Sequence, residues 1–442
     1  MRKKITPPRF IILSFLALII AGGILLIFPF ASSSHQFTNP LITFFTSTSA
    51  TCVTGLVVVD TGTYWSGWGQ FIIILLIQCG GLGYMTITSF FLILLNKKVS
   101  LEHRMILKQG LNVYNISGIM RFLQVTLLVV LVMEGLGTIA LTLRFLRDYS
   151  FWKALTMGAF HSVSAFCNAG FDIMGGFQSF QGYTNDLTLN LTVMILIVTG
   201  GIGFYVLWRL LHPRDRGLTF HVKIVLRVTL FLILAGVGLF LLFEWRNPNS
   251  IANLPLRGKI LAAFFQAITP RTAGFSTVAI KNLHQSTQFI LTWFMLIGGS
   301  PGGTAGGIKT TTFIVITGLV IYSIRRKGSV VIGKRTIKKG TLMRAVFVFG
   351  FAIFVIAVAT LIILFVQGDE FTFLQVLFEV ISAFGTVGLS TGITTHLSSI
   401  SRFVIIVTMF VGRVGSMSLI ISMLGRRKTP HIGYPEEDVA IG

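Results

Sequence analysis

The sequence predicts an all-α protein that crosses a membrane several times. Its composition and its recurring apolar runs both support this prediction. Of the 442 residues, 53% are hydrophobic and only 11% are charged, too few charges to cover a soluble surface of this size. Apolar runs of about 20 residues, enough to span a bilayer as helices, recur from end to end. We expect eight such runs: Phe10–Phe30, Phe71–Leu95, Phe122–Phe145, Leu187–Leu211, Val222–Phe243, Phe289–Ile324 (interrupted), Leu342–Val366 and Phe403–Leu424.

The first run follows three basic residues, as in a secretory signal, but it is longer than the apolar part of most signals. Its end, Phe28-Pro29-Phe30, is also a poor cleavage site, which requires small residues. We therefore expect this run to be a retained membrane helix.

The charges alternate along the chain. The net charge is +22, and 25 of the 36 lysines and arginines lie in alternate connections: the N-terminus, 97–121, 209–227, 325–344 and 426–428. Cytoplasmic loops carry such an excess, so this pattern predicts a multi-pass cell-membrane protein with both termini in the cytoplasm. A nucleic-acid surface at 325–344 is the disfavoured alternative, because basic flanks of this kind more often contact anionic lipid.

A fourfold repeat determines the predicted architecture. Short apolar segments lie between the long runs and align without gaps, each with a Phe ten residues before a Gly: Phe45–Gly55, Phe160–Gly170, Phe264–Gly274 and Phe378–Gly388. At about ten residues they are too short to span, which is typical of re-entrant pore loops. We expect four tandem helix–pore loop–helix units around a central pore with pseudo-fourfold symmetry, at residues 1–98, 99–216, 217–328 and 329–428, followed by a tail at 429–442.

A second set of glycines recurs in the later long run of each unit. These positions are Gly80, Gly81 and Gly83, then Gly200, Gly201 and Gly203, then Gly298 and Gly299, and finally Gly412, Arg413 and Gly415. A single glycine of this kind favours close helix packing, but four copies at matched positions support the repeat.

The repeated loops are suited to binding a cation. Backbone can leave a helix at membrane depth only where it lines a cavity or is buried, and glycine permits the positive φ of such a turn. Inward carbonyl oxygens then replace the hydration shell of the ion, while each short helix directs the negative end of its dipole at the pore. We expect one ion site at the carbonyls near Gly55, Gly170, Gly274 and Gly388.

The predicted filter residues are Thr51, Cys52, Val53, Thr54, Gly55, Phe166, Cys167, Asn168, Ala169, Gly170, Pro270, Arg271, Thr272, Ala273, Gly274, Phe384, Gly385, Thr386, Val387 and Gly388. Asp60 and Asp172 follow two of these loops. They are either cation-concentrating groups at the outer mouth or ordinary solvated loop residues, and the sequence leaves both open.

The third unit is interrupted within its second run. The residues concerned are Gly298, Gly299, Ser300, Pro301, Gly302, Gly303, Thr304, Ala305, Gly306, Gly307 and Lys309. Proline and this many glycines break a helix, and a nucleotide-binding loop is excluded because Ile308 separates Gly307 from Lys309. We expect a movable gate below the filter, with a structural kink as the alternative.

Five charged residues fall within the apolar and pore-loop segments. Arg413 stands where the other units have glycine, and it is either an electrostatic barrier, an anchor for the gate loop or part of a packing salt bridge. Lys309 is expected to extend to the cytoplasmic interface, and Arg271 to pair with Glu379. Glu134 is either protonated or paired with an arginine.

The motifs Ser-Ala-Thr-Cys-Val-Thr-Gly-Leu (49–56), Thr-Pro-Arg-Thr-Ala-Gly-Phe (269–275), Ser-Ala-Phe-Gly-Thr-Val-Gly-Leu (382–389) and Phe-Val-Gly-Arg-Val-Gly (410–415) resemble the Trk/Ktr/HKT superfamily, the bacterial Ktr membrane subunit in particular. The resemblance implies potassium uptake, often stimulated by sodium, with no covalently bound cofactor. It also implies a homodimer, one pore per subunit, on a cytoplasmic ring of nucleotide-binding regulatory subunits. In that family the interrupted segment is an intramembrane gate, and the C-terminus contributes to the dimer contact.

The sequence disfavours two other classes of protein. A secondary transporter with inverted repeats is disfavoured because all four units run in the same direction. A membrane-embedded enzyme is disfavoured because the eight histidines and three cysteines are scattered without metal-ligand spacing. We expect no enzymatic activity and no nucleic-acid partner.

Overall fold

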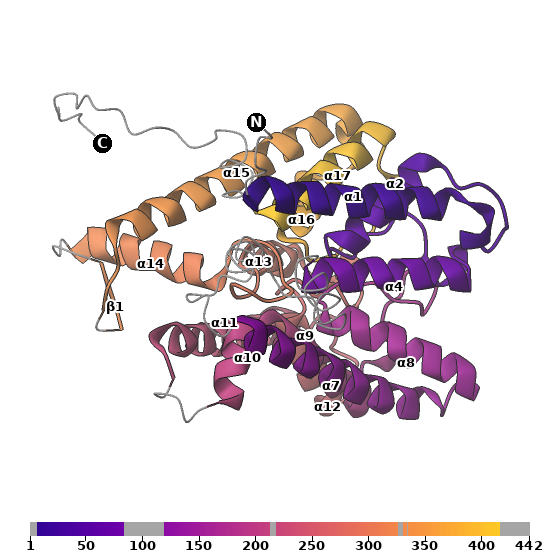
Figure 1. Ribbon diagram of the computed structural model, residues 1–442, viewed down its shortest axis with the longest axis horizontal. Coiled ribbons are helices and arrows are strands. Elements are labelled where there is room, and N and C mark those ends of the chain that lie inside the picture. Colours follow the sequence, from indigo (N-terminus) through magenta and orange to yellow (C-terminus); the bar gives the residue numbers. More distant parts are fainter. Residues whose placement is uncertain (1–6, 84–118, 213–217, 326–329, 334, 416–442) are drawn as a thin grey trace.

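The described part of the protein is mostly helical (Figure 1), as predicted. The computed structural model describes residues 7–83, 119–212, 218–325, 330–333 and 335–415. The predicted tail at 429–442 and the part of the first unit beyond Gly83 lie outside these residues. Strands β1 (Val331–Ile332) and β2 (Arg335–Thr336) form a small antiparallel hairpin.

Each predicted unit opens with a long apolar helix. These are α1 (Pro7–Ile27), α7 (Ile119–Phe145), α11 (Phe220–Glu244) and α15 (Lys339–Gln367). All four are long and apolar enough to cross a membrane, and two-thirds or more of the most apolar stretch of each stays unburied within the chain. An apolar surface of this kind is compatible with lipid as the surrounding solvent, so these helices are the outer wall of the protein.

A short helix follows each long one: α2 (Pro40–Thr51), α8 (Phe151–Phe166), α12 (Leu256–Ile268) and α16 (Phe373–Gly385). With 12 to 16 residues, these helices are too short to span. Their starts are defined by local chemistry: Asn39 caps α2 ahead of Pro40, and Thr372 with Gln375 forms a capping box on α16. Their last turns are fully buried at the centre of the protein.

The second helix of each unit ends near the glycines singled out in the sequence. The helices are α4 (Gly67–Leu82), α9 (Leu187–Gly201) with α10 (Phe204–Leu211), α13 (Gln285–Leu296) with α14 (Thr310–Arg325), and α17 (Ser399–Val414). The apolar run predicted over Leu187–Leu211 is long enough to span as a pair of helices, but it is bent, because α9 and α10 meet at 101°. Gly203, at φ 99°, takes a conformation that a helix cannot contain. The break is therefore not confined to the third unit.

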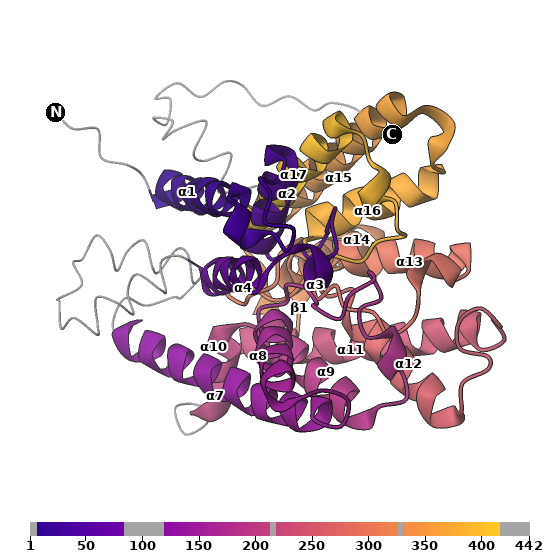
Figure 2. The ribbon, with the colours of Figure 1, turned by 90° about the vertical axis from the view of Figure 1, so that its right-hand side faces the viewer.

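The units follow one another around a common centre (Figure 2). In this view the chain passes from α1 and α4 to α7 and α9, then to α11 and α13, and finally to α15 and α17. The ring closes because α17 packs against α2, so the last unit contacts the first. The remaining single-turn elements lie in the connections: η1 (Pro29–Ala31), α3 (Thr61–Tyr64), η2 (Gln181–Tyr183), η3 (Ile280–Asn282), η4 (Gly368–Glu370) and η5 (Thr394–His396).

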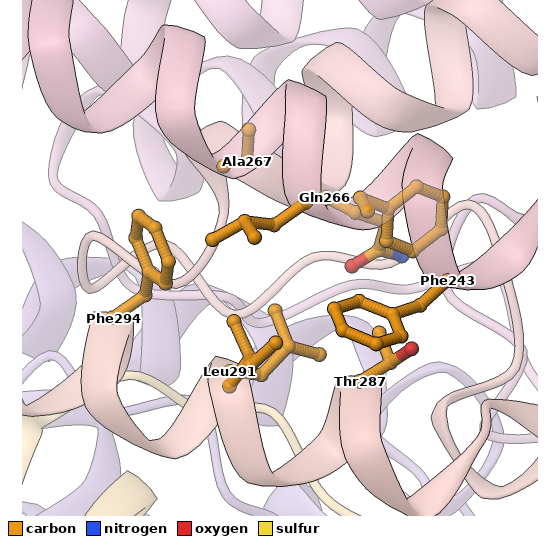
Figure 3. Close-up of a pocket in the computed structure, with 10 residues that line it drawn as sticks. Phe243, Gln266, Ala267, Thr287, Leu291 and Phe294 are labelled. Carbon is orange, nitrogen blue, oxygen red and sulfur yellow. The ribbon is translucent and has the colours of Figure 1, made fainter.

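A buried carboxylate ties the third unit together. Figure 3 shows the pocket between α11, α12 and α13, which Phe243, Thr287, Leu291 and Phe294 line. The Thr287 hydroxyl donates to Glu244 at 2.5 Å. Glu244 is fully buried and also accepts from three other groups: the Asn247 amide (2.7 Å), the Ser250 hydroxyl (2.6 Å) and the backbone N–H of His284 (2.9 Å). A buried carboxylate with this many donors stabilises the fold.

Replacing Glu244 with Ala should lower the free energy of unfolding by about 3 kcal/mol, because four buried donors lose their acceptor. Thermal unfolding in detergent would measure the loss. Glu370→Ala, which removes an exposed carboxylate, should change stability by less than about 0.5 kcal/mol. Equal stability of the two variants would show that the Glu244 network contributes little.

Candidate functional site

Four turns of the chain meet at the centre of the protein. They follow α2, α8, α12 and α16, and we call residues 51–55, 166–170, 270–274 and 384–388 the glycine turns. They contain all twenty residues predicted from the repeat. All of these residues are buried except Gly274 and Gly388, which are half-buried.

The backbone of each glycine turn follows the same pattern. The final glycines have positive φ: Gly55 (89°), Gly170 (70°), Gly274 (81°) and Gly388 (91°). Two residues earlier, each turn has a second left-handed residue that is not glycine: Val53 (57°), Asn168 (59°), Thr272 (69°) and Thr386 (50°). Such conformations are rare for β-branched residues and cost roughly 1–3 kcal/mol each. The surrounding structure must impose them, and nothing in the sequence indicates them.

Neighbouring glycine turns touch one another in a closed ring. A methyl group added to Gly55 would collide with the carbonyl oxygen of Ala169, and one added to Gly170 would lie 2.7 Å from that of Ala273. Likewise Gly274 abuts the Val387 carbonyl, and Gly388 abuts that of Thr54. No side chain larger than hydrogen fits at any of the four positions. Glycine is therefore required here by close approach as well as by its φ.

Buried hydroxyl groups hold the turns in place. The Ser49 hydroxyl accepts from the backbone N–H of Gly55 at 3.1 Å, and Ser382 does the same for Gly388 at 3.1 Å. Ser164 donates to the Phe171 carbonyl at 2.7 Å, and Thr269 to that of Phe275 at 2.5 Å. The signal for these residues was present in the sequence, because three of the four aligned segments have Ser at the same position.

On one side of the ring lies a cavity of about 260 Å³, which we call the vestibule. All four final glycines line it, together with Asp60 and Asp172. Asp60 has structural hydrogen bonds as well, accepting from Gly62 at 2.8 Å and from Phe177 at 2.8 Å. Burial raises the pKa of Asp172 to about 7, and the nearby charge of Asp60 adds to this shift. Asp172 therefore holds its proton more tightly than an exposed carboxylate does.

On the other side of the ring lies the segment that interrupts the third unit. We call residues 298–309 the glycine-rich loop. Within the loop, the backbone N–H of Gly298 donates to the Ile308 carbonyl at 2.8 Å. The backbone N–H of Ser300 joins the loop to the second unit by donating to the Gly201 carbonyl at 2.9 Å. Phe204 donates to Gly302 at 3.0 Å, so the loop fills the space opened by the bend after α9.

Thr304 brings the loop into contact with a glycine turn. Its N–H donates to the Gly200 carbonyl at 3.2 Å. Its hydroxyl donates to the Phe166 carbonyl at 3.3 Å and lies 3.0 Å from the side-chain amide of Asn168. A methyl group added to Gly306 would collide with the Thr386 hydroxyl of another turn. The loop thus lies directly against two of the four turns.

Arg413 connects the loop to two further units. Its guanidinium donates to the Thr304 carbonyl and to the Gly80 carbonyl, the latter at 2.6 Å. Within the described residues it has no carboxylate partner, so the packing salt bridge is not found. Lys309 was expected to extend to the membrane interface, and this was wrong: its Nζ donates back to the Ala305 carbonyl at 2.6 Å. The loop offers it carbonyls that have no helical partner.

The expected pair of Arg271 and Glu379 is also wrong. Arg271 donates to the Thr229 hydroxyl on α11 at 3.2 Å. Glu379 accepts from Thr394 and, at 3.0 Å, from Ser390, both in the segment after the fourth turn. Hydroxyl groups close in sequence satisfy this carboxylate, so it does not need the arginine.

Of the two states left open for Glu134, pairing with an arginine is not found among the described residues. Glu134 accepts from the Gln78 amide at 3.1 Å, between α7 and α4. Its carboxylate also lies 3.8 Å from the thiol of Cys167 in the second glycine turn. It joins the first two units behind that turn.

A mostly helical chain, with apolar helices that stay unburied and four glycine turns that meet at its centre, has the features of a multi-pass membrane transport protein. Comparison with known proteins is consistent with this class. The family model described as TrkH, cation transport protein, matches residues 7–427. The Ktr system potassium uptake protein B of Bacillus subtilis is 36% identical over 99% of this chain and 97% of its own length.

Two further proteins are similar over nearly the whole chain. The potassium/sodium uptake protein NtpJ of Enterococcus hirae is 36% identical over 100% of this chain and 98% of its own. The crystal structure of the potassium transporter TrkH from Vibrio parahaemolyticus superposes with a TM-score of 0.73 at 17% identity, covering 96% of this chain and 86% of that one. The chain therefore belongs to the TrkH family of cation transport proteins, and it is a transporter rather than an enzyme.

Replacing Thr304 with Val keeps the volume of the side chain and removes the hydroxyl that contacts the second glycine turn. Backbone amides of the loop should then exchange with deuterium about five to ten times faster, because one hydrogen bond of about 1 kcal/mol no longer opposes opening. Hydrogen exchange with mass spectrometry would measure this. Thr312→Val is the matched control, since no hydrogen bond of the Thr312 hydroxyl is found among the described residues. Unchanged exchange in Thr304→Val would show that the hydroxyl does not hold the loop.

Proposed function

We propose that this protein takes up potassium across the cell membrane through the ring of glycine turns, which acts as its selectivity filter. The observation that carries the proposal is the closed ring itself. Four unlike segments place glycine against a neighbouring carbonyl at the same level. Backbone oxygens in such a ring can replace the water around a cation without any charged side chain.

The surroundings of the ring favour a cation. The helices α2, α8, α12 and α16 all end at the turns, so the negative ends of their dipoles meet there. The buried hydroxyls of Thr54, Thr272 and Thr386 find no hydrogen-bond partner among the described residues, which suits a path that holds ions and water. No carboxylate belongs to the glycine turns, so selection rests on neutral oxygens.

The choice of potassium rests on the relatives. Two of them are named for uptake of potassium and of potassium and sodium, respectively. Potassium is therefore the permeant ion that we propose, with sodium as a second cation that activates or accompanies it. No covalently bound cofactor takes part.

The glycine-rich loop is the gate in this proposal. It occupies the space against two turns, and Arg413 of the fourth unit fixes it on the same side of the ring. Opening requires the loop to leave, and its glycines can absorb the change in backbone conformation. Each hydrogen bond that holds the loop contributes about 1 kcal/mol, so a partner that binds the open form better by several kcal/mol shifts the balance.

That partner is a regulatory subunit on the cytoplasmic side. The similar proteins B and D of Bacillus subtilis are named as parts of a Ktr system, which supports an assembly of more than one component. We propose a homodimer on a cytoplasmic ring of nucleotide-binding subunits. The excess of lysine and arginine in alternate connections supports cytoplasmic termini.

Replacing Gly388 with Ser should weaken the discrimination of potassium over sodium about tenfold, because a side chain cannot enter the ring without displacing the Thr54 carbonyl. Potassium and sodium fluxes into vesicles containing the reconstituted protein would measure the ratio. Gly350→Ser on α15, where an added side chain meets open space, is the control. Unchanged selectivity in Gly388→Ser would refute the filter assignment.

Replacing Arg413 with Ala should raise potassium flux in the absence of the regulatory subunit roughly tenfold, since a charged hydrogen bond to the loop is lost. Arg413→Lys separates the two hypotheses for this residue. If the charge itself is the barrier, Lys should behave like Arg. If the guanidinium anchors the loop by reaching Thr304 and Gly80 together, Lys should raise flux almost as much as Ala. No change in either variant would place the gate elsewhere.

A further inference from the structure

A pocket of about 420 Å³ lies at one end of the third unit, away from the ring. Its walls come from the first turns of α11, from α14 and from the β1–β2 hairpin. Figure 1 shows α14 with the hairpin beside it. The pocket is amphipathic: Lys223 and Arg227 are its cationic residues, and the rest of its lining is apolar.

The two cations belong to one face of α11. Phe220, Lys223, Ile224, Arg227 and Val228 follow the helical spacing of three and four residues, and all five line the pocket. Lys223 and Arg227 are one turn apart and both are exposed. Neither side chain pairs with a carboxylate among the described residues, and no acidic residue lines the pocket. Like charges at this spacing repel each other and favour an anion between them.

The depth of these residues in the membrane increases the demand for an anion. Helix α11 has 25 residues, so it is about 37 Å long and exceeds the hydrocarbon core of about 30 Å by only a few ångströms at each end. Lys223 then lies near the boundary of the hydrocarbon, and Arg227 about one turn farther in. A cation at that depth is costly without a counter-ion.

The hairpin brings a third cation to the mouth of the pocket. The Arg335 guanidinium lies 5.7 Å from the centre of the Phe220 ring. Ile332, which pairs with Arg335 across the hairpin, lines the pocket and packs over Gly318 of α14. The hairpin therefore covers the pocket from the aqueous side with one apolar and one basic residue.

We propose that this pocket binds an anionic phospholipid. The phosphate lies between Lys223, Arg227 and Arg335, and an acyl chain extends along Ile224, Val228 and Ile314. Basic pockets between membrane helices on the cytoplasmic side are suited to such headgroups. The leaflet follows from the orientation proposed above, but the binding itself does not require it.

The pocket lies close to the end of the glycine-rich loop, so a lipid bound there affects the proposed gate. Helix α14 begins at Thr310, directly after the glycine-rich loop, and its Ile314 is one turn farther on. A lipid in the pocket joins α14 to α11 and thereby limits how far the end of the loop can move.

The test measures lipid binding to the purified full-length protein in detergent by native mass spectrometry, so it does not depend on ion flux. Palmitoyl-oleoyl phosphatidylglycerol is compared with the phosphatidylcholine of the same chains, and with inorganic phosphate as a competitor. The double variant Lys223→Gln, Arg227→Gln should bind phosphatidylglycerol about 30-fold more weakly than the unmodified protein. The charge-preserving pair Lys223→Arg, Arg227→Lys should keep the affinity, which also shows that changes at this face leave the fold intact.

The matched control is Lys339→Gln, Arg344→Gln, which removes two exposed cations from α15 outside the pocket and should have little effect. Equal binding of the two phospholipids, or equal loss in the control, would overturn the proposal. Displacement of the lipid by millimolar phosphate would instead assign the site to a free anion. A photo-crosslinking residue in place of Ile332 should capture lipid in membranes. Capture of protein at this position would contradict the assignment. This experiment does not depend on the folding of the glutamine variants.

Discussion

The contact between each glycine and the carbonyl of the neighbouring turn sets the dimensions of the whole protein. Four such contacts must close at once, so the four short helices have to end at one level and point at one centre. That requirement accounts for the fully buried last turns of α2, α8, α12 and α16 and for the small residues behind them. Gly80, Gly200 and Gly412 allow the second helices to approach the carbonyls of Thr51, Phe166 and Phe384. The ring is therefore supported by a second layer of glycines, not by side-chain packing alone.

A membrane interior adds a second demand, because backbone groups there must find partners within the protein. The structure meets this demand with contacts between units. The glycine-rich loop of the third unit uses carbonyls of the second, and Arg413 of the fourth uses carbonyls of the first and third. Each unit thus depends on another for its irregular backbone. Movement of the loop changes hydrogen bonds that involve all four units, which suits a segment proposed to control the ion pathway.

The sequence was most informative where the repeat constrained it. Aligning four segments was enough to find the final glycines, because glycine at a shared position has few explanations. It was least informative where tertiary structure overrides local preference. Val53 and Thr386 would be expected to be extended, since β-branched residues disfavour positive φ, yet the ring holds both in the left-handed region. The partners of Lys309 and Arg271 were also missed, because a charge at membrane depth can be satisfied by carbonyls or hydroxyls that a sequence does not locate. The bend at Gly203 was missed because the run around it is apolar throughout.

The four turns are unlike because they belong to one chain, and this has a consequence for how such a pore can vary. In a tetramer of identical subunits, every substitution at the filter is made four times. A substitution that ion binding would tolerate in one quadrant can therefore disrupt the filter when all four carry it. Here a mutation alters a single quadrant. The binding properties of the ring can therefore shift in small steps, and a residue such as Arg413 can occur once beneath the ring without three copies that would repel it. Because its four filter segments are separate in sequence, this protein can carry a filter changed in only one, two or three quadrants, which a tetramer of identical subunits cannot.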